Sequence, residues 1–371
     1  RLRYTIPFAD PQATIDHVRA LAERRPGAVV VFGDDGEKFG TWPETQKHVY
    51  HDRWLERFFD ALSANADWLR VSTLGEVYDQ VAPRGKVYLP DCSYREMTEW
   101  ALPVSRQLEL ESVRREMEHD PRWHRIRPFL RGGFWRNFRV KYREADEMYA
   151  RMMNVSRRLQ SALQADSANP DLREAQLHLY RGQCNCPYWH GAFGGIYLPH
   201  LRNAIYHHLI AADTILEKWS RQSEVWVDAR AEDYNFDGKP EIRLANDQFA
   251  AFLAPHEGGM MYELDVREIR LNLGAGIMRR PEAYHQKVLQ GEHRGDAGCA
   301  SIHDRVVFKQ ANLDRHVRYD RYPRKSLVDL FFNPDTTPEA VEAGEAVLVS
   351  DFHTAPYEAA IHANPDRVRV M

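Results

Sequence analysis

The chain has few cysteines, no long apolar run and no excess of one charge. Four cysteines in 371 residues are too few for a disulfide scaffold, so we expect a reducing, cytoplasmic compartment. No stretch approaches about 18 uninterrupted apolar residues, which argues against a membrane span. Lys and Arg number 50 against 54 Asp and Glu, a near-balance that argues against a dedicated nucleic-acid binder. The remaining composition, 43% hydrophobic and 28% charged, is that of a globular chain of two or three domains.

Several signatures of common catalytic sites are also missing. The chain has no phosphate-binding glycine loop, no dinucleotide fingerprint and no G-x-S-x-G nucleophile elbow. It begins at Arg1 rather than at Met, and its first residues lack the charged-then-apolar pattern of a signal peptide. Because residues 3–8 already have a strand-like pattern, we expect the chain to be a piece of a longer protein.

The first 85 residues or so alternate between strand and helix patterns. The predicted strands lie at residues 3–8, 28–32 and 69–72, and the predicted helices at residues 12–25 and 44–64. The run Ala28–Phe32 is continuously apolar and rich in Val, which is typical of a strand buried on both faces. This alternation favours a parallel sheet, either doubly wound or closed as a barrel.

The rest of the chain falls into a helical part and a strand-rich part. Residues 93–219 carry Leu, Met, Arg and Glu at helical spacing. After Trp226 the pattern changes to short alternating segments separated by turn residues, which predicts an antiparallel β domain of sandwich type. The predicted strand segments are 224–228, 241–244, 249–253, 260–264, 306–308 and 346–349.

The strongest local signal is an acidic turn that follows the apolar run. Asp34 and Asp35 come directly after it, flanked by Gly33 and Gly36, which would allow a sharp turn. With Glu37 two residues on, the crowded negative charges disfavour full ionisation and can leave one carboxyl protonated. Such a carboxyl can act as a general acid. An ordinary surface turn closed by a Glu–Lys pair explains the same residues equally well.

A second signal is the aromatic segment from Cys184 to Arg202. It combines four aromatic residues with two His and three Gly after a predicted helix. Flat rings beside amide and imidazole groups suit a sugar, whose C–H faces stack and whose hydroxyls need hydrogen bonds. The Cys184-x-Cys186 spacing is a weak indication of zinc because no second cysteine pair accompanies it. A buried aromatic cluster is the alternative.

A third signal is a run of oxygen-bearing side chains that resembles the first half of a calcium loop. Asp233, Asn235 and Asp237 alternate with other residues, and Gly238 and Glu241 follow. The acid expected at the twelfth loop position is absent, since Leu244 stands there. We therefore consider a structural Ca²⁺ held by Asp233, Asn235, Asp237 and Glu241, and a plain Asx-rich turn as the alternative.

Several long and unlike segments resemble glycoside hydrolase family 57, in its α-amylase/4-α-glucanotransferase branch. The resemblance lies in Gly33–Gly40, Pro83–Pro90, Arg131–Phe138, Cys184–Arg202, Arg279–His285 and His303–Val306. It implies a multidomain α/β + β protein in three parts. These are the C-terminal part of a (β/α)7-type barrel at residues 1–90, a helical domain completing the active site at 91–222, and an incomplete β-sandwich domain at 223–371.

The resemblance also implies a retaining mechanism on α-1,4-glucans that needs no catalytic cofactor. Asp35 resembles the acid/base, and Trp189 resembles the donor-side substrate contact. Further substrate contacts are expected from Asp34, Glu37, Lys38, Trp42, Asn185 and His190. The family's nucleophilic Glu precedes the Asp pair, whereas the only Glu before Asp34 is Glu23, in a predicted helix. Because a retaining mechanism needs both carboxyls, we expect these 371 residues to be inactive alone.

Two other functions remain open at this point. A metal-dependent polysaccharide deacetylase also carries Asp-Asp-Gly at a strand end, but its paired histidines would have to be His48 and His51, inside a predicted helix. A carbohydrate-binding module that lost the chemistry is the non-enzymatic alternative. The expected partner is an α-glucan or maltooligosaccharide, and a homodimer is also considered. These residues do not indicate whether water or a second glucan accepts the sugar.

Overall fold

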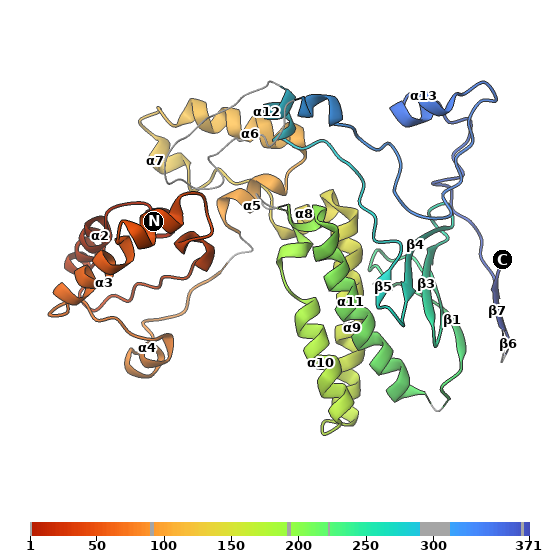
Figure 1. Ribbon diagram of the computed structural model, residues 1–371, viewed down its shortest axis with the longest axis horizontal. Helices are drawn as coiled ribbons and strands as arrows, with labels where there is room; N and C mark the ends of the chain where they lie inside the picture. The colour runs from red at the N-terminus through yellow and green to blue at the C-terminus, as the bar shows by residue number, and fades with distance from the viewer. Residues whose placement is uncertain (1, 90–92, 191–193, 222, 290–311, 365–366) are drawn as a thin grey trace. The chain divides into compact units, whose positions relative to one another are not determined.

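The computed structural model describes residues 2–89, 93–190, 194–221, 223–289, 312–364 and 367–371. They cluster into two compact units. The first unit combines Arg1–Pro90 with Gln286–His316, and the second combines Asp91–His285 with Val317–Met371. All strands of the described residues lie in the second unit (Figure 1). The three domains expected from the sequence stay predictions.

The first unit is built from short helices. These are α1 (Leu2–Thr5), α2 (Pro11–Arg24), α3 (Trp54–Ala64), α4 (Leu74–Gln80), the 3-10 helices η1 (Gly36–Phe39) and η5 (Leu313–His316), and the π-helix η2 (Lys47–His51). Helix α2 begins where the sequence predicts, because the Asp10 carboxylate accepts from the Gln12 N–H. Helix α2 packs on α3, and Ile15 of α2 and Trp54 of α3 are both buried. The predicted helix 44–64 is interrupted at Arg53, whose φ of 57° is left-handed.

The parallel sheet predicted for this unit is not formed among its described residues. Residues 3–8 begin in helix α1, and residues 28–32 and 69–72 belong to no helix or strand of the described residues. Val29 and Val31 are 45% and 63% exposed, although their run was predicted to be buried. A strand needs the backbone of a neighbour for its hydrogen bonds, and an apolar run does not say whether that neighbour is present. The (β/α)7 barrel stays a prediction.

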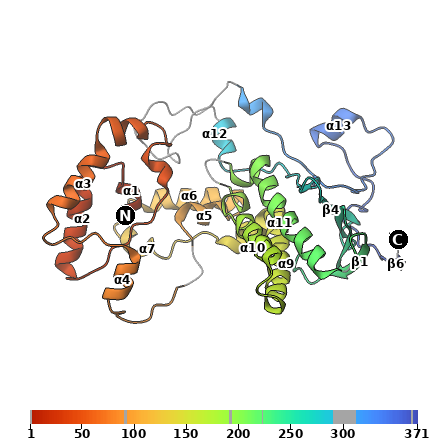
Figure 2. The ribbon, with the colours of Figure 1, turned by 60° about the horizontal axis from the view of Figure 1, so that its bottom comes forward.

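The second unit contains the predicted helical segment. Its helices are α5 (Arg95–Trp100), α6 (Val104–Met117), α7 (Trp123–Ile126), α8 (Trp135–Lys141), α9 (Arg143–Ala165), α10 (Pro170–Gly182), α11 (Pro199–Ser220) and α13 (Pro338–Ala343), with 3-10 helices η3 (Cys186–Tyr188) and η4 (Gly195–Tyr197). Helices α9, α10 and α11 lie side by side around a core that includes Val155, Leu172 and Leu209 (Figures 1 and 2). A Cβ at Gly182 would come within 2.8 Å of Leu209, so this glycine allows α10 and α11 to approach closely. Helix α12 (His285–Leu289) begins at His285, the last residue of the Asp91–His285 stretch of this unit.

The strand-rich part forms an antiparallel sheet, as predicted. Strands β1 (Val227–Glu232), β2 (Glu241–Asn246), β3 (Phe249–Ala254), β4 (Met260–Val266) and β5 (Leu271–Asn272) pair in chain order. Strands β6 (Ile361–Asn364) and β7 (Arg367–Val370) form a hairpin beside β1. The predicted strand at 346–349 is not formed, since Leu348 makes only an isolated bridge with Phe332, and residues 306–308 lie outside the described residues. A sandwich is not confirmed.

Buried charges join the helices to this sheet. The Arg151 guanidinium on α9 donates to Glu263 at 2.8 Å and to Asp265 at 3.0 Å, both on β4. Asp213 on α11 is fully buried, and Arg267 donates to it at 3.0 Å. Burial alone would raise the pKa of Asp213, but the surrounding guanidinium groups hold that pKa well below its usual range. Because a buried charge without its partner costs several kcal/mol, this network fixes how the sheet packs on α9 and α11.

Candidate functional site

The acidic turn of the first unit holds one buried carboxylate and two exposed ones. The Asp34 side chain is 3% exposed and accepts from Lys38 Nζ at 2.5 Å. Lys38 Nζ also donates to the Arg3 carbonyl at 2.8 Å and lies 5.4 Å from the centre of the Trp42 ring. Asp35 and Glu37 are exposed. The charge of Asp34 is thus balanced by Lys38, so the three carboxylates of this turn are not all unpaired.

This pairing also bears on the expected substrate contacts. Asp34, Lys38 and Trp42 are buried among residues of the first unit, where they support the turn instead of presenting polar atoms on the surface. The Trp42 ring stacks on Phe8 at 5.9 Å. The structure therefore gives these three residues a packing role, while the exposed Asp35 and Glu37 are open to a ligand. That any of these five residues contacts substrate stays a prediction.

A cavity of about 450 Å³ lies in the second unit, at the aromatic segment. Five aromatic residues line it together with two methionines and three polar residues: Tyr94, Trp135, Tyr149, Tyr188, Trp189, Met97, Met152, Ser93, Gln183 and Asn185. Rings that present flat faces, next to a few amide and hydroxyl groups, form the kind of surface on which a sugar ring stacks. Asn185 and Trp189, two residues that the sequence indicated for sugar binding, line this one cavity.

Backbone geometry fixes Trp189 at the cavity. Gly195 has a φ of 45°, which turns the chain so that the Ile196 N–H donates to the Trp189 carbonyl at 2.8 Å. The Trp189 ring stacks on Trp100 with 5.2 Å between ring centres and meets Tyr94 edge to face at 5.8 Å. Rings from α5 and its amino end thus hold the indole in one orientation. A preset ring loses little entropy when a ligand binds.

His190 lies behind this wall rather than in the cavity. It is 3% exposed, and its Nε2 lies 2.6 Å from the Tyr142 hydroxyl. Glu282 accepts from the hydroxyls of Tyr142 and Tyr197, each at 2.5 Å, and from Lys141 Nζ at 3.4 Å. Burial lowers the pKa of His190 to about 4, although the nearby Glu282 carboxylate opposes the shift. At neutral pH the imidazole is therefore uncharged, and its contacts are those of a supporting residue.

Comparison with known proteins identifies the family. A model of glycosyl hydrolase family 57 matches residues 1–90. Models of the middle and C-terminal domains of α-amylase/4-α-glucanotransferase match residues 133–216 and 233–370. The chain belongs to glycosyl hydrolase family 57. The resemblance seen in the sequence is thereby confirmed.

Individual family 57 proteins are similar over nearly the whole chain. Alpha-amylase 1 of Dictyoglomus thermophilum is 36% identical, over 100% of this chain and 52% of its own length. The 4-alpha-glucanotransferase of Thermococcus litoralis is 36% identical, over 96% of this chain and 52% of its own length. A crystal structure of 4-alpha-glucanotransferase from Thermococcus litoralis superposes with a TM-score of 0.77 at 34% identity, covering 97% of this chain and 50% of that one. The chain spans about half the length of the curated relatives it matches.

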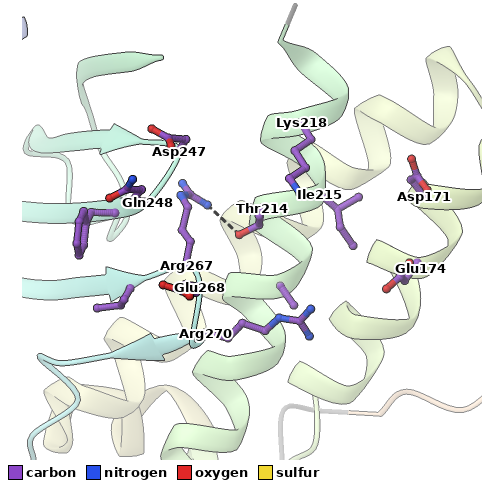
Figure 3. Close-up of a pocket in the computed structure, with 13 residues that line it drawn as sticks. Asp171, Glu174, Thr214, Ile215, Lys218, Asp247, Gln248, Arg267, Glu268 and Arg270 are labelled. Carbon is purple, nitrogen blue, oxygen red and sulfur yellow. Dashed lines mark hydrogen bonds between the residues drawn. The ribbon is translucent and has the colours of Figure 1, made fainter. Parts of the chain in front are cut away.

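A larger cavity, of about 760 Å³, lies between α10, α11 and the sheet (Figure 3). Asp171 and Glu174 reach it from α10 and Lys218 from α11, while Arg267 at the end of β4 donates to the Thr214 hydroxyl at 3.1 Å. Its lining carries charges of both signs and a single aromatic residue, Phe249. A neutral sugar finds fewer stacking surfaces here than in the aromatic cavity, so we place the candidate sugar site in the aromatic cavity.

The residues of the other sequence hypotheses have contacts of their own. His48 and His51, required by the deacetylase hypothesis, lie on η2, and His48 Nε2 is 2.9 Å from the Pro7 carbonyl. Among the described residues, the His, Cys, Asp and Glu side chains close enough to share a metal ion are Asp237, Glu241 and His256. Cys184 and Cys186 are both exposed thiols. None of the described helices is both long and apolar enough to cross a membrane.

Sequence reasoning missed the residues that support the cavity from a distance. Glu282 and Tyr142 are 140 positions apart in the chain, and Trp100 lies far from Trp189 in sequence. Nothing local to Glu282 distinguishes it from a surface acid, although its segment, Arg279–His285, was part of the family resemblance. That resemblance was the one signal that could have indicated it.

Proposed function

We propose that this chain is the part of an α-glucan-active enzyme that binds the sugar chain and supplies the acid/base. The observation that carries the proposal is the aromatic cavity, because it combines Trp189 and Asn185 with four further rings. Relatives of this chain bear the names α-amylase and 4-alpha-glucanotransferase. Both names fit a site that holds an α-glucan. The expected substrates are α-1,4-glucans and maltooligosaccharides.

In the proposed chemistry, Asp35 gives its proton to the glycosidic oxygen that leaves, while a second carboxylate attacks the anomeric carbon. Asp35 then takes a proton from the incoming hydroxyl, whose oxygen attacks the anomeric carbon and displaces the second carboxylate. Water as acceptor gives hydrolysis, and a hydroxyl of a second glucan gives transfer. The carboxyl of Asp35 is exposed and so accessible to a ligand, whereas the Asp34 carboxylate is held in a buried ion pair with Lys38.

The attacking carboxylate is proposed to lie outside these 371 residues. Glu23 is the only Glu that precedes Asp34, and it is an exposed residue of helix α2. A retaining mechanism needs the two carboxyls about 5–5.5 Å apart. We therefore expect the chain to bind maltooligosaccharides without turning them over.

Chromatography of maltooligosaccharide products tests this proposal. The chain alone should give no products from maltotriose or amylose, and robust turnover would contradict the missing nucleophile. Asp35 is then tested in the chain extended by the residues that its gene encodes in frame upstream. There, Asp35→Asn should lower the rate at least about 100-fold, and the exposed control Asp67→Asn should not. Full activity of Asp35→Asn would overturn the acid/base role. Glucan binding without turnover by the extended chain would instead indicate a binding module.

A further inference from the structure

The loop between β1 and β2 uses most of its predicted calcium ligands for its own backbone. The Asp233 carboxylate accepts from the N–H groups of Asp237 at 3.1 Å and Gly238 at 3.0 Å. Asn235 Oδ1 accepts from the Asp237 N–H at 2.8 Å, and Asp237 Oδ1 accepts from the Lys239 N–H. These are the bonds of Asx turns. Asp233 and Asn235 are therefore engaged in shaping the loop.

Two carboxylate oxygens of the loop remain, and both face His256. Asp237 Oδ2 lies 3.3 Å from His256 Nε2, and Glu241 Oε1 lies 3.7 Å from His256 Nδ1. His256 comes from the turn after β3, so it was not part of the sequence motif. One ligand atom from each of the three side chains can be chosen so that all lie within 4.8 Å of one another. This spacing is small enough for a single ion to contact all three.

The Glu241 carboxylate gives the second, independent indication. Glu241 is fully buried at the start of β2, and its Oε2 accepts from the N–H groups of Tyr234 and Asn235. Its Oε1 is buried and has no hydrogen-bond partner in the described part of the chain, and the same holds for His256 Nδ1. A buried carboxylate oxygen without a donor costs free energy. A cation bound between Glu241 and His256 would remove that cost.

We propose that Asp237, Glu241 and His256 bind one divalent transition-metal ion, with Zn²⁺ preferred. One imidazole nitrogen and two carboxylate oxygens are ligands that Zn²⁺ takes, with water completing its shell. Calcium needs six or more oxygens, which this set does not supply. The proposal thus replaces the Ca²⁺ and the ligands Asp233 and Asn235 suggested by the sequence motif. The ion would tie the β1–β2 loop to the turn after β3.

Titration of metal-free chain tests the site. After chelator treatment, isothermal titration with ZnCl₂ should show one ion per chain, and Zn²⁺ should raise the melting temperature, while CaCl₂ should do neither. Glu241→Gln and His256→Gln should weaken Zn²⁺ binding at least about 100-fold. Asp237 is partly exposed, so Asp237→Asn serves as a variant with little risk to folding, and it should weaken binding about tenfold.

The matched control is Asp233→Asn, which removes a carboxylate from the same loop but outside the proposed set. It should bind Zn²⁺ within about threefold of the unchanged chain. Calcium binding that Asp233→Asn abolishes would overturn the proposal in favour of the oxygen-rich loop. If no metal bound and NMR showed His256 to be protonated at neutral pH, the proposal would be overturned in favour of an ion triad of His256 with the two carboxylates.

Discussion

Replacement of Glu282 by Gln should destabilise the second unit and loosen the wall behind Trp189. The carboxylate is 3% exposed and accepts from two tyrosine hydroxyls and from Lys141. The amide keeps one acceptor oxygen but turns an NH₂ group toward one of these donors. It also leaves Lys141, which is largely buried, without its counter-charge. A hydrogen bond to a charged group contributes about 1.5–3 kcal/mol, and breaking a buried pair costs about 3–5 kcal/mol. We therefore expect a loss of about 3 kcal/mol.

Urea unfolding followed by circular dichroism measures this loss. Glu345→Gln, at an exposed glutamate of the same unit, is the control and should change the free energy of unfolding by less than about 0.5 kcal/mol. If Glu282→Gln cost no more than Glu345→Gln, Glu282 would not be the centre of the network. The reasoning that His190 and Tyr142 are held in place by this carboxylate would then be wrong.

Three further predictions follow from buried groups and backbone geometry. Because burial lowers the pKa of His190 to about 4, the unfolded chain takes up a proton near pH 6.5 that the folded chain accepts only near pH 4. The free energy of unfolding should therefore fall by about 3 kcal/mol as the pH drops through this window, and an unchanged slope in His190→Gln would contradict this. Arg151→Met should cost about 3–5 kcal/mol in urea unfolding, since it removes a cation from beside the buried Asp213 carboxylate; a loss under 1 kcal/mol would refute the role of this pair. Gly195→Ala should weaken maltoheptaose binding in calorimetry, because its Cβ would overlap the Trp189 carbonyl; unchanged affinity would show that the loop does not fix the ring.

Local sequence signals predicted the elements whose stabilising contacts are also local. Helix α2 begins at its Asp10 cap, and the antiparallel sheet follows the alternation after Trp226. The apolar run Ala28–Phe32 was misleading, because burial of a strand depends on neighbours far along the chain. The long-range pattern of family motifs, by contrast, identified family 57 correctly.

The candidate site was predictable in part for the same reason. Asn185 and Trp189 lie four positions apart and were found from one segment. Glu282, which supports the same site, comes from a distant segment of the chain. The ion pair between Asp34 and Lys38 joins neighbours in sequence, yet the sequence could not tell a buried pair from a surface one. His256 likewise joins the β1–β2 loop only because β2 and β3 are paired.

Calorimetric titration of the chain with maltoheptaose tests most directly whether the aromatic cavity binds an α-glucan. We predict saturable binding at one site, weakened at least about tenfold by Trp189→Ala, which corresponds to about 1.4 kcal/mol for a lost stacking surface. Trp219→Ala, at a partly exposed indole on α11 outside the aromatic cavity, should bind like the unchanged chain. No binding, or equal affinities for all three proteins, would contradict the assignment of the cavity to an α-glucan.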